Sequence, residues 1–230
     1  MAAVANPFSF LPGYGFYVDS QYAKCAPTCV KGMTIAVGGG GLSTSVAAPL
    51  ASWLGKGHMN LSDLKYLTVP IISNVPVAMS QGVAQIGDIV SPFEAPLVAN
   101  GSIKLVSAIP PGSLLNCFVV GPAGFAHPAA VDAFLRAVSR TMSTYLKPGY
   151  LHKAKVVNAL ASVLNESASQ VQGTVAPTFD PTMSLNEAGP KVTVQQTTWL
   201  SVGGLLNYTT PLLPSKVVNK SFLAAAIGTP

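Results

Sequence analysis

The sequence predicts an α/β fold: a lobe with a short, mainly parallel sheet, followed by a helical C-terminal part. Short β-branched runs alternate with helical stretches between residues 31 and 125. Short loops join them, which is typical of parallel strand pairs. Beyond residue 126 the apolar residues recur at spacings of three and four, which indicates helices.

The elements follow in chain order. Residues 1–30 contain Pro and Gly without periodicity, so we expect an irregular arm with one short strand near 15–18. Strands are expected over 33–37, 66–72, 84–90, 103–109 and 116–120. Helices are expected over 46–54, 75–81, 92–99, 131–147, 152–164, 167–173, 192–204 and 221–227. The predicted domains are the arm, an α/β lobe (31–125) and a helical segment (126–230) that packs on the lobe.

Composition narrows the classes of function. Of 230 residues, 49% are apolar and 9% are charged, so the chain can bury a core and is not disordered. The net charge of +5 is dispersed, and Arg136 and Arg140 are the only arginines. Nucleic-acid binding proteins cluster their basic residues, so no nucleic acid is expected as a partner. A diffuse positive charge suits a small anionic ligand or general solubility.

The cysteines and histidines suggest no metal site. Cys25 and Cys29 are close in sequence, Cys117 stands alone in an apolar run, and no histidine-rich set accompanies them. We therefore expect neither a metal nor a cofactor. A disulfide between Cys25 and Cys29, or between one of them and Cys117, would require an oxidising compartment.

The long uncharged stretches do not predict membrane spans, because Gly, Pro and polar residues interrupt each of them. The N-terminus has neither a basic region nor a clean apolar core. No signal peptide and no transmembrane helix are therefore expected in this chain.

A glycine run between a predicted strand and a predicted helix is the main candidate site. Backbone amides of such a loop, with the helix N-terminus, can hold an anion, and nearby hydroxyls can add hydrogen bonds. The run matches neither dinucleotide nor P-loop motifs. Alternatively, it is a flexible connection in which Ser43 caps the helix.

A second strand-to-helix turn should lie on the same rim, since ligands gather at the carboxyl ends of strands. Glu94 in this turn also suits the helix dipole without any ligand. The candidate ligand-binding residues are Gly39, Gly40, Gly41, Ser43, Thr44, Ser45, Ser91, Pro92 and Glu94.

Taken together, these segments resemble type 2 periplasmic binding proteins. Lys31–Val37, with the glycine loop after it, is similar to the start of their second lobe. Further similar segments follow in order at 78–82, 91–94, 127–134, 178–181, 199–205 and 218–223. The branch resembled serves nitrate, sulfonate, taurine and thiamine-precursor ABC importers. The resemblance implies a periplasmic-binding-protein-like fold, capture of a small organic anion, an ABC permease as partner, and a periplasmic or secreted location once a signal is removed.

The sequence departs from this family in three respects. Gln85 stands where the family has Asp, and Ser91 stands where it has Trp, so the ligand need not be the family's. Only 30 residues precede the strand that begins the second lobe. The resemblance thus covers the second lobe and the C-terminal helices, with most of the first lobe missing. An uncovered inter-lobe face would favour a homodimer.

The enzymatic alternative is a serine hydrolase of small esters. Ser91 would be the nucleophile, with Ser43 and Ser45 as alternatives, His127 or His58 the base, and Asp88 the group that orients the base. No G-x-S-x-G elbow is present to support it.

Overall fold

The computed structural model describes residues 1–10, 13–109, 117–164, 167–174, 176–185, 188–202 and 205–228. The chain forms two compact units, each built from separate stretches. The sheet unit comprises Pro12–Leu114 and Thr193–Pro211. The helical unit comprises Met1–Leu11, Leu115–Val192 and Leu212–Pro230. The division falls within helix α8 (Ala188–Val202).

A five-stranded sheet in the order β5-β4-β6-β3-β7 organises the sheet unit. Its strands are β3 (Gly15–Asp19), β4 (Thr34–Gly38), β5 (Lys65–Val69), β6 (Ile86–Ile89) and β7 (Ile103–Ala108). Strand β4 pairs in parallel with β5 and β6, whereas β3 runs antiparallel to β6 and β7. The sheet is therefore mixed, because the strand from the predicted arm lies between β6 and β7.

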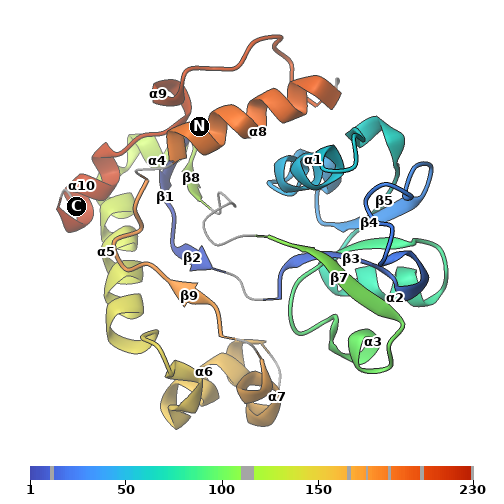
Figure 1. Ribbon diagram of the computed structural model, residues 1–230. Coiled ribbons are helices and arrows are strands. Elements are labelled where there is room, and N and C mark those ends of the chain that lie inside the picture. Colours follow the sequence, from blue (N-terminus) through green and yellow to red (C-terminus); the bar gives the residue numbers. More distant parts are fainter. Residues whose placement is uncertain are drawn as a thin grey trace. The chain divides into compact units, whose positions relative to one another are not determined.

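Helices cover both faces of this sheet (Figure 1). They are α1 (Ala47–Gly55), α2 (Val75–Ser80) and α3 (Ala95–Ala99). On one face, Trp53 of α1 stacks on Phe16 of β3, with ring centroids 5.6 Å apart. On the other face, α2 packs so closely on β6 that a Cβ atom at Gly87 would lie 2.5 Å from the Met79 sulfur.

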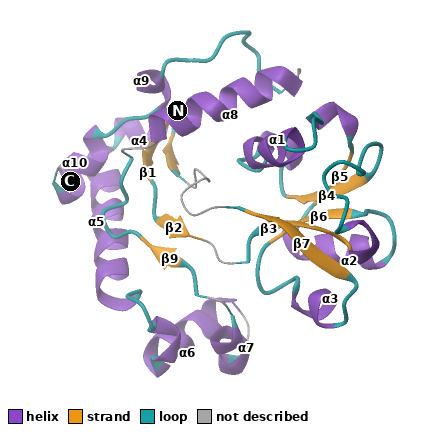
Figure 2. Ribbon diagram, viewed as in Figure 1, coloured by secondary structure: helices purple, strands orange, loops and turns teal. Residues whose placement is uncertain are grey.

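The helical unit contains two small antiparallel pairings and most of the long helices (Figure 2). Strand β1 (Ala2–Ala5) pairs with β8 (Phe118–Val120), and β2 (Phe8–Phe10) pairs with β9 (Thr178–Phe179). Its helices are α4 (Pro122–Ala126), α5 (Pro128–Tyr145), α6 (Ala154–Leu164), α7 (Ala168–Gly173), α9 (Pro214–Val217) and α10 (Ser221–Ile227), with the first turn of α8.

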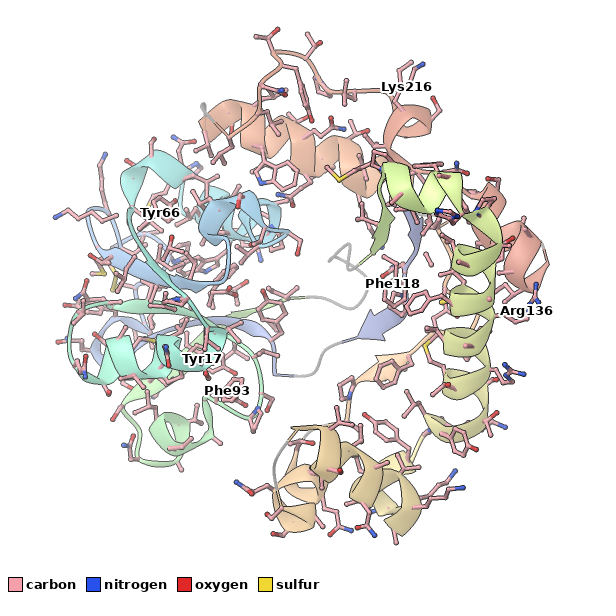
Figure 3. All side chains as sticks on the ribbon, turned by 180° about the vertical axis from the view of Figure 1, so that it is seen from behind. Tyr17, Tyr66, Phe93, Phe118, Arg136 and Lys216 are labelled. Atoms are coloured by element: carbon pink, nitrogen blue, oxygen red, sulfur yellow. A yellow bond between two sulfur atoms is a disulfide. The ribbon has the colours of Figure 1, made fainter. Side chains whose placement is uncertain are left out.

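The C-terminal end of the chain is held within the helical unit. The Asn219 amide donates to the Ala3 carbonyl at 2.9 Å. Arg136 of α5, labelled in Figure 3, donates through Nε to the carbonyl of Ala226 in α10. The core buries Val4, Leu135, Met142, Met183, Phe222 and Leu223. Phe118 of β8 packs edge-on against Phe134 of α5 (Figure 3).

The α/β fold class is confirmed. The strand expected near residues 15–18 and the five other expected strands are all present, with shifted bounds. Two local expectations were wrong. The arm is not irregular over 1–10, because β1 and β2 pair with strands more than a hundred residues away. Helix α1 begins at Ala47 with Val46 as its N-cap, so Ser43 does not cap it.

The described residues include no helix both long and apolar enough to cross a membrane. A disulfide joins Cys25 and Cys29, one of the pairings left open by the sequence. Cys117 is a free thiol and is half-buried.

The β3–β7 pairing gives a stability prediction. A Cβ atom at Gly15 would lie 2.6 Å from the backbone oxygen of Ser107, so Gly15→Ala must displace an edge strand. We expect a loss of about 1–3 kcal/mol in the free energy of unfolding, measured by urea denaturation. The control is Gly55→Ala, because a Cβ at Gly55 in α1 meets nothing within 4 Å. The control should be neutral or stabilising by up to about 1 kcal/mol. Equal stabilities for the two variants would contradict this packing.

Candidate functional site

The parallel pairing brings two predicted site segments to one edge of the sheet. Ile35 and Ala36 of β4 lie opposite Ile86 and Gly87 of β6. Both strands run in the same direction, so the glycine loop after β4 and the turn after β6 leave the same carboxyl edge. This edge is called the rim below.

The glycine loop follows β4 directly, and glycine is required in it. Gly39 and Gly41 have φ values of +61° and +60°, a region that side chains with a Cβ rarely adopt. A Cβ at Gly41 would also lie 2.7 Å from the Thr68 hydroxyl oxygen of β5. Gly39 and Gly40 are exposed, whereas Gly41 is buried. The loop therefore leans over β5 and presents its first two residues to solvent.

The hydroxyls predicted to bind an anion are occupied within the loop. Ser43 donates to the Gly40 carbonyl, and Thr44 donates to the Gly41 carbonyl at 2.8 Å. The register of β4 with β5 directs the Gly39 amide to the Val69 carbonyl, whereas among the described residues no hydrogen-bond acceptor contacts the backbone amides of Gly40 and Ser45. The loop thus offers an anion its amides, not its Ser43 and Thr44 hydroxyl protons.

Helix α1 adds less to an anion site than the sequence suggested. Its third residue is Pro49, which has no amide proton, and the Ala47 amide already faces the Thr44 carbonyl at 3.5 Å. Few amides of its first turn stay available, so the loop before the helix is the stronger donor group.

Two side chains of α8 hold the loop from the other side. Trp199 Nε1 donates to the Leu42 carbonyl at 2.7 Å, and Gln195 Nε2 donates to the Thr44 carbonyl at 3.2 Å. Gln195 is nearly buried, and the neighbouring Gln196 accepts a hydrogen bond from the Tyr208 hydroxyl. The Thr44 carbonyl and the Ser45 amide belong to one peptide group, so the Gln195 bond restricts the orientation of that amide, while the Trp199 bond restrains the middle of the loop.

The turn after β6 packs against the chain just before β3, whereas the glycine loop packs against β5. The Ser91 hydroxyl donates to Glu94 Oε1 at 2.7 Å. Both residues lie against Gly13, where a Cβ atom would be 2.8 Å from Ser91 Cβ. Pro92 is exposed, and Glu94 is the N-cap of α3. The glycine loop and this turn thus share the rim but pack against different parts of the sheet unit, β5 and the segment before β3.

Asp88 is a buried carboxyl group on β6, only 2% exposed. The Tyr14 hydroxyl donates to its Oδ2 over a long 3.4 Å, and no described residue satisfies its Oδ1. Burial raises the pKa of Asp88 to about 7, against an opposing effect of the Tyr14 hydrogen bond. Burial, and then the charge of Asp88, raise the pKa of Tyr14.

Two grooves flank α1 in the sheet unit. One, of about 240 Å³, is lined by Ala48, Pro49, Ser52, Trp53, Lys56, Ser107, Ala108 and Val194. The other, of about 320 Å³, is lined by Leu42, Ala51, Met59, Asn60, Leu61, Ser62, Tyr66, Ser201 and Val202. Tyr66 of this second groove is labelled in Figure 3, and its hydroxyl donates to the Leu61 carbonyl.

The residues proposed for ester hydrolysis do not form a catalytic set within either unit. Ser91 donates to Glu94, not to a histidine, and Asp88 contacts Tyr14. His127 belongs to the helical unit, where it ends α4 and precedes α5. Among the described residues, no group of three or more His, Cys, Asp or Glu side chains could hold a metal ion.

Comparison with known proteins identifies the fold. No protein-family model matches the sequence, and no curated protein matches it. Solved structures do match: the alkanesulfonate-binding protein SsuA from Xanthomonas axonopodis pv. citri bound to MOPS has a TM-score of 0.61 at 19% identity, over 95% of this chain and 73% of that one. The fold is that of the periplasmic binding proteins.

Two further solved structures are similar in fold to this chain. The ligand-binding component of an ABC-type import system from Staphylococcus aureus, with zinc bound, has a TM-score of 0.66 at 13% identity, over 99% of this chain and 75% of that one. The periplasmic nitrate-binding protein NrtA from Synechocystis PCC 6803 has a TM-score of 0.65 at 14% identity, over 99% and 68%.

Sequence reasoning missed the residues that surround the candidate site. Tyr14 reaches Asp88 from the predicted irregular arm, and Gln195 reaches the loop from 151 residues away. Trp199 reaches the Leu42 carbonyl from a position similarly distant in sequence. No local pattern marks such contacts, although a short strand near residues 15–18 did indicate that the arm joins the sheet.

Asp88 gives a pH-dependent prediction. Its pKa in the folded chain lies above the ordinary value of 3.8, so the folded state holds this proton more tightly than the unfolded chain. The resulting stabilisation is complete below about pH 4, falls as the pH rises, and is lost above about pH 7. Asp88→Asn should remove this decline, which amounts to a few kcal/mol in the free energy of unfolding.

Urea denaturation between pH 4 and pH 8 measures this decline in the free energy of unfolding. The control is Asp63→Asn, because hydrogen bonds with Asn60 and Lys31 lower the pKa of Asp63. That contribution is instead lost as the pH falls. If the Asp88→Asn protein loses stability with rising pH as the wild type does, Asp88 is not the cause of the decline.

Proposed function

We propose that this chain is a solute-binding protein that captures a small organic anion, of the sulfonate or carboxylate kind, for an ABC importer. The anion contacts the glycine loop at the rim of the sheet unit. Periplasmic binding proteins for sulfonate and for nitrate have the same fold, which supports the class of function. The low identities leave the ligand to be argued from the residues of this chain.

The observation that carries the proposal is the pair of free amides at Gly40 and Ser45 in the glycine loop. Gly40 lies between the positive-φ residues Gly39 and Gly41, and amides in such alternating conformations can point toward one anion, as in backbone nests. The Gln195 hydrogen bond to the Thr44 carbonyl fixes the peptide group that carries the Ser45 amide before a ligand arrives, and the Trp199 bond holds the loop two residues earlier. Preorganisation of this kind raises affinity by reducing the entropy lost on binding.

The remaining parts of the proposal concern location and partners. The Cys25–Cys29 disulfide favours an oxidising compartment such as the periplasm. An ABC permease would receive the ligand there. Two further points stay predictions. The first is that the chain corresponds to a second lobe with C-terminal helices. The second is a homodimer through an uncovered face, which native mass spectrometry tests.

The test compares two glycines that have the same backbone constraint. Gly39 and Gly32 both have positive φ, and a Cβ at either meets nothing within 4 Å. Alanine should cost about 1–2 kcal/mol of stability at each position. Only Gly39→Ala places a methyl group beside the free amides, so it should weaken binding of methanesulfonate at least tenfold while Gly32→Ala leaves binding unchanged.

Isothermal titration calorimetry with methanesulfonate, nitrate and acetate gives these affinities. The proposal fails if none of the three binds at millimolar concentration. Equal affinities for the Gly39→Ala and Gly32→Ala proteins would also contradict it, since the anion would then lie away from the loop.

A further inference from the structure

The groove between α1, β7 and α8 has a chemical character of its own. It is called the Trp53 groove here, and its lining is that of the 240 Å³ groove described above. Trp53 is 3% exposed and lies on Phe16, so its ring is a rigid apolar wall. Across the groove, Ser107 of β7 is the register partner of Phe16. All of these residues belong to the sheet unit.

Helix α1 presents two rows of side chains to this groove. Ala48, Ser52 and Lys56 are spaced four residues apart, so they follow one line along the helix. Pro49 and Trp53 form the adjacent line. The first row places a hydroxyl and an ammonium group together near the C-terminal end of α1, and the second row is apolar. The groove is thus amphipathic along its length.

The polar groups of the groove are hydrogen-bond donors without partners. Within the described part of the chain, the hydroxyls of Ser52 and Ser107 and the ammonium of Lys56 have no hydrogen bond or ion pair. Trp53 Nε1, a donor only, is buried and also unsatisfied among these residues. No Asp or Glu lines the groove. This combination is complementary to an anion and not to a cation.

We propose that the Trp53 groove binds an amphipathic organic anion, an alkyl or aryl sulfonate or carboxylate. Its head group accepts hydrogen bonds from Lys56 and Ser52. Its apolar body lies on Pro49, Trp53 and Val194, and Val194 is 58% exposed in the structure, so a ligand can cover it. The volume of about 240 Å³ is below the usual range for drug-sized ligands, which limits the body to a short chain or a single ring.

This site does not depend on the glycine loop. The lining of the Trp53 groove includes none of Gly39–Ser45, and the two sites have different requirements. The loop offers backbone amides and recognises a head group alone, whereas the groove also recognises an apolar body. Two sulfonates with the same head group therefore distinguish them.

Calorimetric titration of the full chain with hexane-1-sulfonate and with methanesulfonate tests the proposal. We expect hexane-1-sulfonate to bind at least tenfold more tightly, because only it covers Trp53 and Val194. Lys56→Met should weaken hexane-1-sulfonate binding about tenfold, since it removes a charge-assisted hydrogen bond. Val194→Asp should weaken it further by placing a negative charge in the groove.

Two variants are controls. Lys65→Met removes another exposed lysine of the sheet unit and should leave hexane-1-sulfonate binding unchanged. Gly39→Ala separates the two sites: it should weaken methanesulfonate binding, while the tighter binding step of hexane-1-sulfonate at the groove is retained. The groove is refuted if the two sulfonates bind equally, if Lys56→Met behaves like Lys65→Met, or if Gly39→Ala weakens both sulfonates alike. Each of these results leaves the loop proposal standing, because that proposal is tested separately by the effect of Gly39→Ala on methanesulfonate binding.

Discussion

The parallel pairing of β4 with both β5 and β6 is the constraint on which the rest of the sheet unit depends. It sends the chain out of two adjacent strands at the same edge, and the loops there must turn at once. Gly38 shows how little room this leaves, because a Cβ atom on it would lie 2.7 Å from the Ile72 Cα atom that follows β5. Close approach of this kind explains why the sequence has a run of glycines at this point, independently of any ligand.

Charge is distributed unevenly across the sheet unit. Its five lysines are Lys24, Lys31, Lys56, Lys65 and Lys104. Four of them lie at the starts of strands or in the loop before β4, and Lys56 ends α1, so all are away from the rim. The rim instead carries Glu94 and the buried Asp88. An anion at the rim must therefore be held by backbone amides, which explains why orientation of the loop by Trp199 and Gln195 would matter.

The sequence predicted those parts of the fold that have a local physical signal. The β-branched run at Thr34–Gly38 and the apolar run at Ile86–Ile89 are strands because buried parallel strands favour such residues. Strand β1 has the sequence AAVA, which lacks β propensity, and it forms because β8 and α10 cover it. The start of α1 was misplaced because Ser43 and Thr44 bond to loop carbonyls instead of helix amides. The α8 contacts and the Trp53 groove arise from residues distant in sequence, and no pattern encodes them locally.

The central claim is that backbone amides of the glycine loop hold the anion. A methanesulfonate titration followed by amide proton and nitrogen NMR shifts tests it most directly, because each amide reports separately. The account predicts that the Gly40 and Ser45 amides shift downfield together with one dissociation constant, while Gly32 and Gly55 do not move. Saturable shifts confined to the residues around Lys31 and Lys65, with the loop amides unchanged, would contradict it.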